Sequence, residues 1–260
     1  MEFKVFSSLK KLLKRIILPL KFEKYFDLIS YTHTYLNNKV ASYPILWNMD
    51  NLKLIKKVLI LAPHPDDEIF GMGGTIIKLK KLGTSIKIVW MTNADNEVRK
   101  KEASKILNLL NIKQSLEEAF PIKGKHFLID EGKEVIKKEL EIYKPHVIFL
   151  PSIFDSHHDH VRLNLSLRDV LKEHKWNGKI MQYEVWNTLI PNVLIDISDV
   201  VKEKEKMMKI YQSQLQEPKR CYVERILCLN KYRGLPYCID YAEGFILYNS
   251  KDKYLKVYRR

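Results

Sequence analysis

The stretch "VLILAPHPDDEIFGMGG", Val58 to Gly74, constrains the fold more than any other part of the chain. Its apolar start is typical of a strand that is buried on both faces of a sheet. A histidine and three carboxylates follow at once, and a glycine cluster comes next. Ionised groups are costly to bury without partners, so we expect this strand to end at the mouth of a cleft rather than in the core.

Short apolar segments alternate with helical segments from about residue 50 onward. We expect strands at 57–62, 85–92, near 118–122, 146–151, near 180–186, 193–197 and 244–249. We expect helices at about 73–82, 98–110, 130–143, 162–174 and 199–213. This alternation predicts an α/β fold with a Rossmann-like, mostly parallel sheet and helices on both faces. In such sheets the active site lies at the C-terminal ends of the strands.

The length and composition favour one catalytic domain with an appendage. The chain has 260 residues, of which 46% are hydrophobic, enough to bury one large core. The sequence predicts a basic amphipathic N-terminal arm at 1–50 and the catalytic domain at 51–260. The cysteines match no zinc-finger or redox spacing, so they are expected to be reduced thiols of a cytoplasmic protein. They are Cys221, Cys228 and Cys238.

The beginning of the chain is basic but is a poor signal peptide. Its apolar run "IILPL" is short, is interrupted by Pro19, and is far below the length of a membrane span. Read as a helix, it has an apolar face of Phe6, Leu9, Leu13, Ile16, Ile17 and Leu20, and its cations Lys10, Lys11, Lys14 and Arg15 lie mostly off that face. Two interpretations remain open: peripheral contact of residues 1–20 with an anionic membrane, or docking on the chain's own core or on a second copy.

The net charge of +14 makes an acidic partner plausible. The positive residues are scattered along the chain, however, and no aromatic-basic RNA motif is present. The acidic candidate site would also repel a phosphate backbone. No nucleic-acid partner is therefore expected, and the sequence does not indicate an oligomeric state.

A second polar cluster, "PSIFDSHHDH", follows the strand expected at 146–151. His64 and Asp67 are three residues apart, as are His157 and His160, which is close to one helical turn. Imidazole and carboxylate donors of this kind suit Zn²⁺ with an open position for water, and a further carboxylate can accept the proton of that water. The alternative for "HPDDE" alone is a solvated loop or helix N-cap. A Mg²⁺-dependent phosphohydrolase would favour oxygen ligands over two histidines.

These motifs carry a family resemblance. "PHPDDEIFGMGGTI" resembles the signature of the PIG-L/LmbE-type zinc-dependent de-N-acetylases, and "DSHHDH" resembles that family's second motif. Three further segments are similar to family segments in chain order: "RKKEASKILNLLNI", "KMMKIYQSQL" and "YAEGFILY". The resemblance covers about residues 56–248 and leaves the N-terminal arm outside. One departure is "TNADN", where the family often has glycine after Thr92.

The resemblance implies roles for individual residues. His64, Asp67 and His160 would be the ligands of one zinc ion per chain, or of another divalent metal. Asp66 would be the general base, and a cationic His157 would polarise the substrate carbonyl or protonate the departing amine.

Other residues would support this site. Asp155 and Asp159 would hydrogen-bond imidazole N–H groups and so fix their tautomers. Arg99 is a weaker candidate for substrate contact, with a salt bridge to Glu102 as its alternative. Glu68 would contact substrate or cap the following helix.

The implied reaction is metal-dependent hydrolysis of a linear amide C–N bond, which removes the acetyl group from an N-acetylglucosamine-type sugar. The basic arm favours a lipid-linked or membrane-proximal glycan. A small soluble conjugate, of the thiol-precursor or nucleotide-sugar type, remains an alternative.

Overall fold

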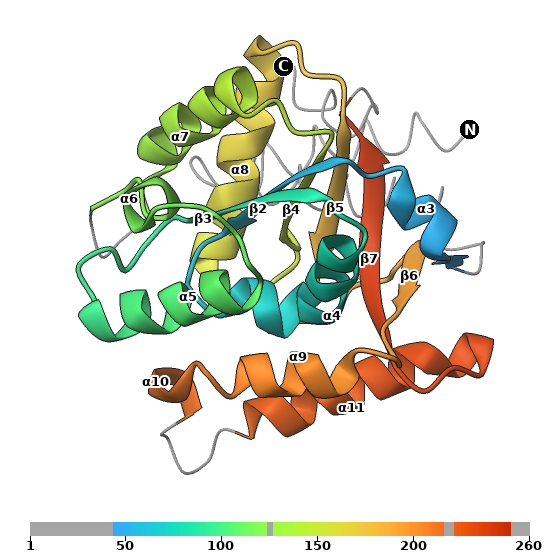
Figure 1. Ribbon diagram of the computed structural model, residues 1–260. Coiled ribbons are helices and arrows are strands. Elements are labelled where there is room, and N and C mark those ends of the chain that lie inside the picture. Colours follow the sequence, from blue (N-terminus) through green and yellow to red (C-terminus); the bar gives the residue numbers. More distant parts are fainter. Residues whose placement is uncertain (1–43, 124–126, 216–220, 251–260) are drawn as a thin grey trace, which may run out of the picture. The chain divides into compact units, whose positions relative to one another are not determined.

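The computed structural model describes residues 44–123, 127–215 and 221–250, which belong to one compact unit spanning Tyr43–Leu255. Within these residues, seven strands form one sheet in the order β1-β6-β7-β5-β4-β2-β3 (Figure 1). The strands are β1 (Ile45–Trp47), β2 (Lys57–Ala62), β3 (Ser85–Trp90), β4 (Val147–Pro151), β5 (Lys179–Tyr183), β6 (Val193–Asp196) and β7 (Ala242–Asn249). The helices are α3 (Met49–Lys53), α4 (Asp67–Lys81), α5 (Glu97–Leu109), α6 (Leu116–Ala119), α7 (Ile129–Ile142), α8 (His158–Glu173), α9 (Val201–Met208), α10 (Gln212–Leu215), α11 (Tyr222–Gly234) and the short η1 (Leu235–Tyr237).

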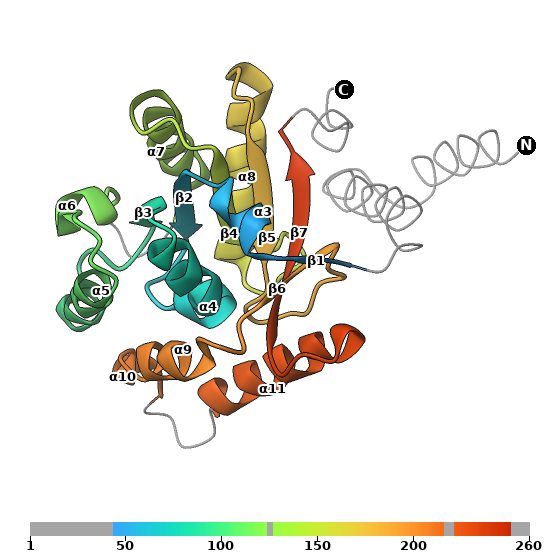
Figure 2. The same cartoon turned by 45° about the vertical axis from the view of Figure 1, so that its right-hand side comes forward.

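The sheet is mostly parallel, as the alternation of elements predicts. Strand β2 runs parallel to β3 and β4, and β4 runs parallel to β5. Only β7, among the described strands, is antiparallel to its neighbours β5 and β6. Helices α7 and α8 cover one face of the sheet and α4 covers the other, while α9 and α11 lie next to α4 (Figures 1 and 2). The predicted α/β class is confirmed.

The predicted strand near 118–122 is wrong. The segment forms the helical turn α6 followed by an irregular stretch. The Ser115 side chain accepts from the backbone N–H of Glu118, and the Glu118 carboxylate accepts from the N–H of Ser115. This reciprocal capping box satisfies the first free N–H groups of a helix and so favours a helical turn over an extended strand.

Three further elements differ from expectation. Strand β1 pairs with β6 inside the range assigned to the arm, so the sheet begins earlier than the predicted boundary near residue 50. The single helix expected at 199–213 is two helices, α9 and α10, and α11 was not anticipated. A strand of three residues carries too little alternation to be recognised from sequence. The amphipathic face predicted within residues 1–20 lies outside the described residues.

Helix α4 begins at Asp67, well before the predicted start near residue 73, and it is interrupted at Met72, where the backbone has φ −143° and ψ 24°. The interruption leaves the N–H groups of Gly74 and Thr75 without helical acceptors. The carboxylate of Glu243 on β7 accepts from both, at 2.9 and 2.8 Å, and from the Thr75 hydroxyl at 2.6 Å. Glu243 therefore caps the second half of a broken helix.

The charge of Glu243 is balanced inside the core. Lys204 on α9 is fully buried and places its ammonium 2.7 Å from Glu243 and 2.8 Å from the side-chain oxygen of Asn230. Burial lowers the pKa of Lys204, and the charge of Glu243 opposes that shift. The ion pair thus joins α9, β7 and the middle of α4.

The glycines of α4 permit close packing against the sheet. A Cβ on Gly71 would lie 2.2 Å from the Tyr183 ring and 2.7 Å from the carbonyl oxygen of Glu184. A Cβ on Gly74 would lie 2.6 Å from Ile197. Helix α4 can therefore approach the ends of β5 and β6 only because these positions lack side chains.

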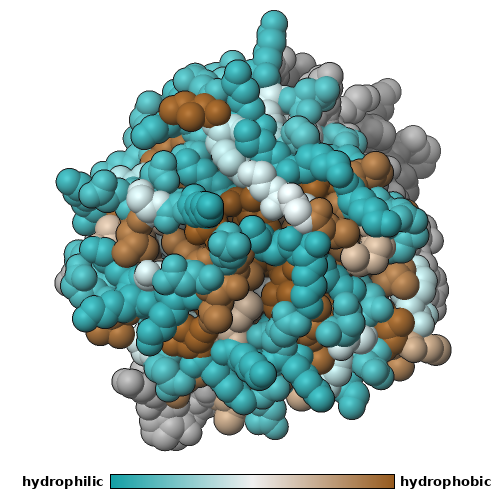
Figure 3. All heavy atoms as spheres, viewed as in Figure 1, coloured by the Kyte–Doolittle hydropathy of each residue, from teal (hydrophilic) through white to brown (hydrophobic). Residues whose placement is uncertain are grey.

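The surface is mainly hydrophilic on the face that Figure 3 shows, with apolar patches between the polar side chains. Exposed apolar residues such as Leu54, Leu109 and Ile142 lie on different elements. All three cysteines are free and exposed. Among the described helices, none combines the length and apolarity needed to cross a bilayer.

We predict that Lys204→Met lowers the free energy of unfolding by about 3–5 kcal/mol, because it leaves the buried Glu243 carboxylate without its counter-charge. The matched control is Lys81→Met, which removes an exposed ion pair with Glu203 and should cost about 1 kcal/mol or less. Urea denaturation of both variants measures the difference. Equal losses for the two variants would show that the buried pair has no special role.

Candidate active site

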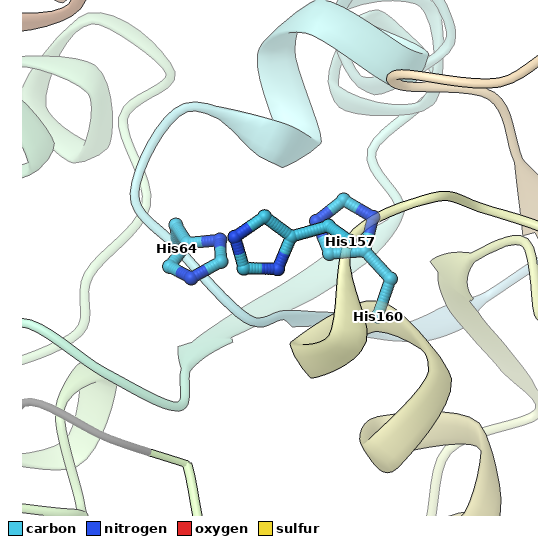
Figure 4. A group of neighbouring side chains, drawn as sticks. All are labelled: His64, His157 and His160. Atoms are coloured by element: carbon cyan, nitrogen blue, oxygen red, sulfur yellow. The ribbon is translucent and has the colours of Figure 1, made fainter.

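The two polar clusters predicted from the sequence lie together at the C-terminal rim of the sheet. His64 is on the loop after β2, and His157 and His160 are at the start of α8, which follows the adjacent strand β4. Figure 4 shows the three imidazoles gathered between these two elements. The ring centroid of His157 lies 4.6 Å from that of His64 and 5.2 Å from that of His160.

Asp67 lies between two of these imidazoles. Its Oδ2 is 3.2 Å from His64 Nδ1 and 3.3 Å from His160 Nε2, and it also accepts the backbone N–H of His64 at 2.9 Å. In a tetrahedral zinc site with bonds of ~2.0–2.1 Å, neighbouring donor atoms lie ~3.3 Å apart. The two separations from Asp67 Oδ2 therefore match those between neighbouring ligands of a small divalent cation.

Unsatisfied polar atoms gather at the same point. Asp67 Oδ1 and both ring nitrogens of His160 are buried and make no hydrogen bond among the described residues. Buried polar atoms without partners are rare because each is costly. A cation held by His64, Asp67 and His160 would give His160 Nε2, one of these atoms, a partner, so the residues present fit a metal.

An outer carboxylate lies beside each of the two imidazoles, at the nitrogen that faces away from Asp67. Asp159 Oδ2 is 3.3 Å from His64 Nε2, and Asp155 Oδ2 is 3.3 Å from His160 Nδ1. Once the inner nitrogens lose their protons, protons held on the outer nitrogens leave the lone pairs of His64 Nδ1 and His160 Nε2 free to bind a metal. Carboxylates in this position orient metal-binding histidines and make them stronger donors.

His157 has a different environment. It is the N-cap of α8, and its Nδ1 accepts the backbone N–H of Asp159 at 3.2 Å. Nδ1 therefore carries no proton, and the neutral ring holds its proton on Nε2. Burial and the positive charges of His64 and His160 lower the pKa of His157. The cationic state expected from the family resemblance is thus disfavoured in this arrangement.

The capping role also bears on which residues bind the metal. His64, His157 and His160 can each offer one ligand atom, all within 4.8 Å of one another. Binding through His157 Nε2 would leave that ring with no proton, since Nδ1 is already an acceptor, and binding through Nδ1 would break the cap of α8. The shorter donor distances through Asp67 favour His64, Asp67 and His160 as the ligand set.

The ionisation of the ligand groups reflects their mutual contacts. Burial opposes protonation of His64, but the charge of Asp67 and the contact with Asp159 raise its pKa to about 9. Burial opposes protonation of His160 as well, but Asp67 and Asp155 raise its pKa to about 10. Burial alone would raise the pKa of Asp67, yet the two imidazoles hold it well below its usual range.

Asp66 sits in a strained turn directly before α4. Its φ of 131° is far from the values that side-chain-bearing residues adopt, a strain that costs about 1–3 kcal/mol. Burial and the charge of Asp67 raise the pKa of Asp66 well above its usual value, while the charges of Arg99 and His64 act in the opposite direction. Strain of this kind is characteristic of functional positions.

Glu68 has a structural environment. It is fully buried and accepts from Trp90 Nε1 at 2.9 Å, from the Tyr211 hydroxyl at 2.5 Å and from the backbone N–H of Asp66 at 3.2 Å. Burial raises its pKa to about 7. Substrate contact, one of the two roles expected for Glu68, is not supported, because its oxygens already bind the chain. Its bond to Asp66 instead braces the strained turn.

Arg99 lies at the start of α5, after β3, and is partly exposed. The charge of Arg99 acts to lower the pKa of Asp66, so Arg99 lies near the site. Glu102, the alternative partner expected for Arg99, accepts the N–H and hydroxyl of Ser213 at 2.8 and 2.6 Å. Sequence reasoning did not identify Tyr211 as a partner of Glu68, although Tyr211 lies within the recognised segment "KMMKIYQSQL".

Comparison with known proteins identifies the domain that carries these residues. Residues 59–171 match the family model PIG-L, described as GlcNAc-PI de-N-acetylase. The matched segment covers less than half of the chain. The resemblance drawn from the motifs is thereby confirmed, and the PIG-L match includes both histidine clusters.

Relatives of known structure or function extend this match. The chain is 27% identical over 194 residues to diacetylchitobiose deacetylase of Thermococcus kodakarensis, covering 63% of this chain and 72% of the relative. N,N′-diacetylchitobiose deacetylase from Pyrococcus horikoshii aligns with a TM-score of 0.63 at 23% identity, over 90% of this chain and 96% of that one. The 4-carboxy-2-hydroxymuconate hydratase from Pseudomonas putida KT2440 aligns with a TM-score of 0.60 at 14% identity, over 74% and 96%. These two structures show the shared fold, and because one is a hydratase, the fold alone does not determine the reaction.

We predict that zinc binding to the metal-free protein at pH 7 releases about one proton each from His64 and His160, since pKa values of about 9 and about 10 keep both protonated there. Apparent zinc affinity should rise as pH rises from 7 towards 10, because fewer protons then compete with the metal. Titration calorimetry in buffers of different ionisation enthalpy measures the release.

His158→Ala is the control for this measurement, because His158 is exposed and outside the ligand set. It should leave proton release unchanged, whereas His160→Ala should weaken binding and reduce the release. Binding without proton release in the unaltered chain would contradict the protonation states given above.

Proposed function

We propose that this chain is a metal-dependent deacetylase that hydrolyses the acetamide of an N-acetylglucosamine-type sugar. The proposal depends on one observation: Asp67 Oδ2 lies 3.2 Å from His64 Nδ1 and 3.3 Å from His160 Nε2. A second carboxylate, that of Asp66, directly precedes Asp67 in the chain. The name of the family model and those of both diacetylchitobiose deacetylases supply the reaction type and the substrate class.

His64, Asp67 and His160 would hold the metal. Two nitrogens and one oxygen suit zinc better than magnesium, which favours oxygen ligands alone. A zinc ion bound there supplies Lewis acidity and lowers the pKa of a coordinated water. This donor set also argues against a magnesium-dependent phosphohydrolase at the same rim.

Asp66 accepts a proton from the attacking water. A carboxylate whose pKa is raised by burial and by a neighbouring negative charge is a better proton acceptor near neutral pH than an ordinary one. The water oxygen forms a bond to the acetyl carbon and the C–N bond breaks. The proton then passes to the departing nitrogen, so the products are acetate and a free amine.

His157 donates a hydrogen bond to the acetyl oxygen through Nε2–H. The contact of its Nδ1 with the N–H of Asp159 fixes both the tautomer and the ring. A fixed donor aimed at an oxygen that gains negative charge stabilises the transition state without reorganisation. In this role His157 acts as a neutral donor, and the proton that the amine needs comes from Asp66.

Arg99 would bind a hydroxyl or an acidic group of the sugar conjugate from the β3 side of the site. Both ends of the chain are basic, which favours a conjugate that lies at an anionic membrane surface. Residues 1–43 contain eight Lys and Arg against three Asp and Glu, and residues 251–260 contain five against one. Although positive residues occur along the whole chain, these two segments account for +9 of the net charge of +14, which supports a membrane-proximal glycan as substrate.

We predict that Asp66→Asn lowers kcat for acetate release by about 10²- to 10⁴-fold while the bound metal is retained, because the variant removes only the proton acceptor. The assay measures acetate from a panel of N-acetylglucosaminyl compounds, with metal content determined on the same samples. His158→Ala should behave like the unaltered chain, and His160→Ala should lose metal and activity together. If no N-acetyl compound releases acetate from the metal-loaded protein, the proposed reaction is wrong.

We also predict that the full chain sediments with vesicles containing anionic lipid and that reversing the charges of Lys10, Lys11, Lys14 and Arg15 to Glu abolishes this binding. Neutral vesicles serve as the control for the lipid. Reversal of four exposed lysines on the described helices, Lys105, Lys138, Lys202 and Lys206, to Glu serves as the control for net charge. Equal sedimentation of the two charge-reversed chains would remove the argument for a membrane-proximal substrate.

A further inference from the structure

An exposed tryptophan borders the candidate site on the side opposite Arg99. Trp186 follows β5 and is 38% exposed, whereas Trp47 is 9% exposed, Trp90 is fully buried and Trp176 is partly buried. Strands β3 and β5 flank the central pair β2 and β4 in the sheet. Arg99 and Trp186, which follow β3 and β5, therefore lie on the two sides of the histidine cluster.

The loop that carries Trp186 is fixed to the histidine loop. The backbone N–H of Trp186 donates to Asp155 Oδ2 at 3.0 Å, and the same oxygen lies 3.3 Å from His160 Nδ1. The side-chain amide of Asn187 donates to the carbonyl oxygen of Phe154 at 3.1 Å. The position of Trp186 is therefore set relative to the proposed metal ligand His160.

A buried ion pair fixes the other side of this loop. Arg233 on α11 donates through Nε to Glu184 at 3.1 Å and through Nη2 to the carbonyl oxygen of Leu189 at 2.7 Å. Glu184 also accepts the N–H of Leu189 at 2.9 Å. The loop is thus held at both Glu184 and Leu189 by the ion pair between Glu184 and Arg233, which limits its motion.

Tyr222 supports the indole from α11. Its ring centroid lies 4.8 Å from that of Trp186 at an interplanar angle of 66°, an edge-to-face contact. The Tyr222 ring also lies 6.3 Å from Phe70, three residues after Asp67 on α4. The aromatic pair is thus connected to the helical turn that carries the site, and part of the indole stays open to solvent.

We propose that Trp186, supported by Tyr222, is a stacking subsite for a second sugar ring linked to the N-acetylated one. The inference rests on the proposed function and narrows its substrate to glycans of at least two rings. A pyranose has an apolar C–H face that packs against an aromatic ring, while its hydroxyls stay in water. An indole held in place before binding loses little conformational entropy, so the contact contributes to affinity.

The test compares N,N′-diacetylchitobiose with N-acetylglucosamine as substrates. Trp186→Ala should lower kcat/KM for the disaccharide by about fivefold to tenfold, mainly through KM, and leave the monosaccharide value unchanged. Trp186→Phe should restore part of the loss. Metal content should stay constant, because the bond from residue 186 to Asp155 uses the backbone N–H. Tyr232→Ala, which removes a 65% exposed aromatic ring elsewhere on α11, is the matched control.

Two outcomes would overturn the subsite: equal losses on both substrates with reduced metal content, or no loss on either. Calorimetric binding of the disaccharide to metal-free protein separates this inference from the reaction itself. If the unaltered chain releases no acetate, weaker binding by Trp186→Ala but not by Tyr232→Ala would still support the subsite. Equal binding by the two variants would overturn it.

Discussion

The bond between Glu243 and the interrupted helix α4 joins the helix that carries Asp67 to the antiparallel strand of the sheet. A continuous helix would satisfy its own N–H groups, but α4 breaks at Met72 and needs an external acceptor. Glu243 reaches it from the antiparallel strand β7, and Lys204 neutralises the resulting buried charge. The second half of α4 is therefore anchored to β7 and α9, while the first half, before the break, carries Asp67.

The adjacent carboxylates of Asp66 and Asp67 acquire opposite properties from their surroundings. Both are buried, which disfavours the charged form of each. Asp67 touches two imidazoles that stabilise its charge, whereas Asp66 faces the negative charge of Asp67. Paired titratable groups whose environments separate their pKa values take different parts in acid–base chemistry. Here that separation supports the proposed roles, metal binding for Asp67 and proton transfer for Asp66.

The sequence predicted the parts of the fold that local patterns determine. The apolar run at 57–62 predicted β2 with its observed bounds, and the position of each cluster directly after a strand of a mostly parallel sheet predicted that both lie at one rim. Features set by distant contacts were not predictable. Glu243 of β7 caps the second half of α4 after its break at Met72, and Arg233 of α11 holds the loop that carries Trp186. The strand expected near 118–122 failed because a capping box outweighed its apolar residues.

The segments that follow the strands at this rim fall into two groups, one proposed for chemistry and one for substrate recognition. Those after β2 and β4 carry the histidines and aspartates, while those after β3 and β5 carry Arg99 and Trp186. Asp155 joins the two functions, because one of its oxygens contacts both His160 and the N–H of Trp186. A change in the β5 loop that moved this N–H would also release the carboxylate that orients a metal ligand. The side chain at 186 can therefore vary with the substrate, but the backbone at that position must stay where the metal site requires it.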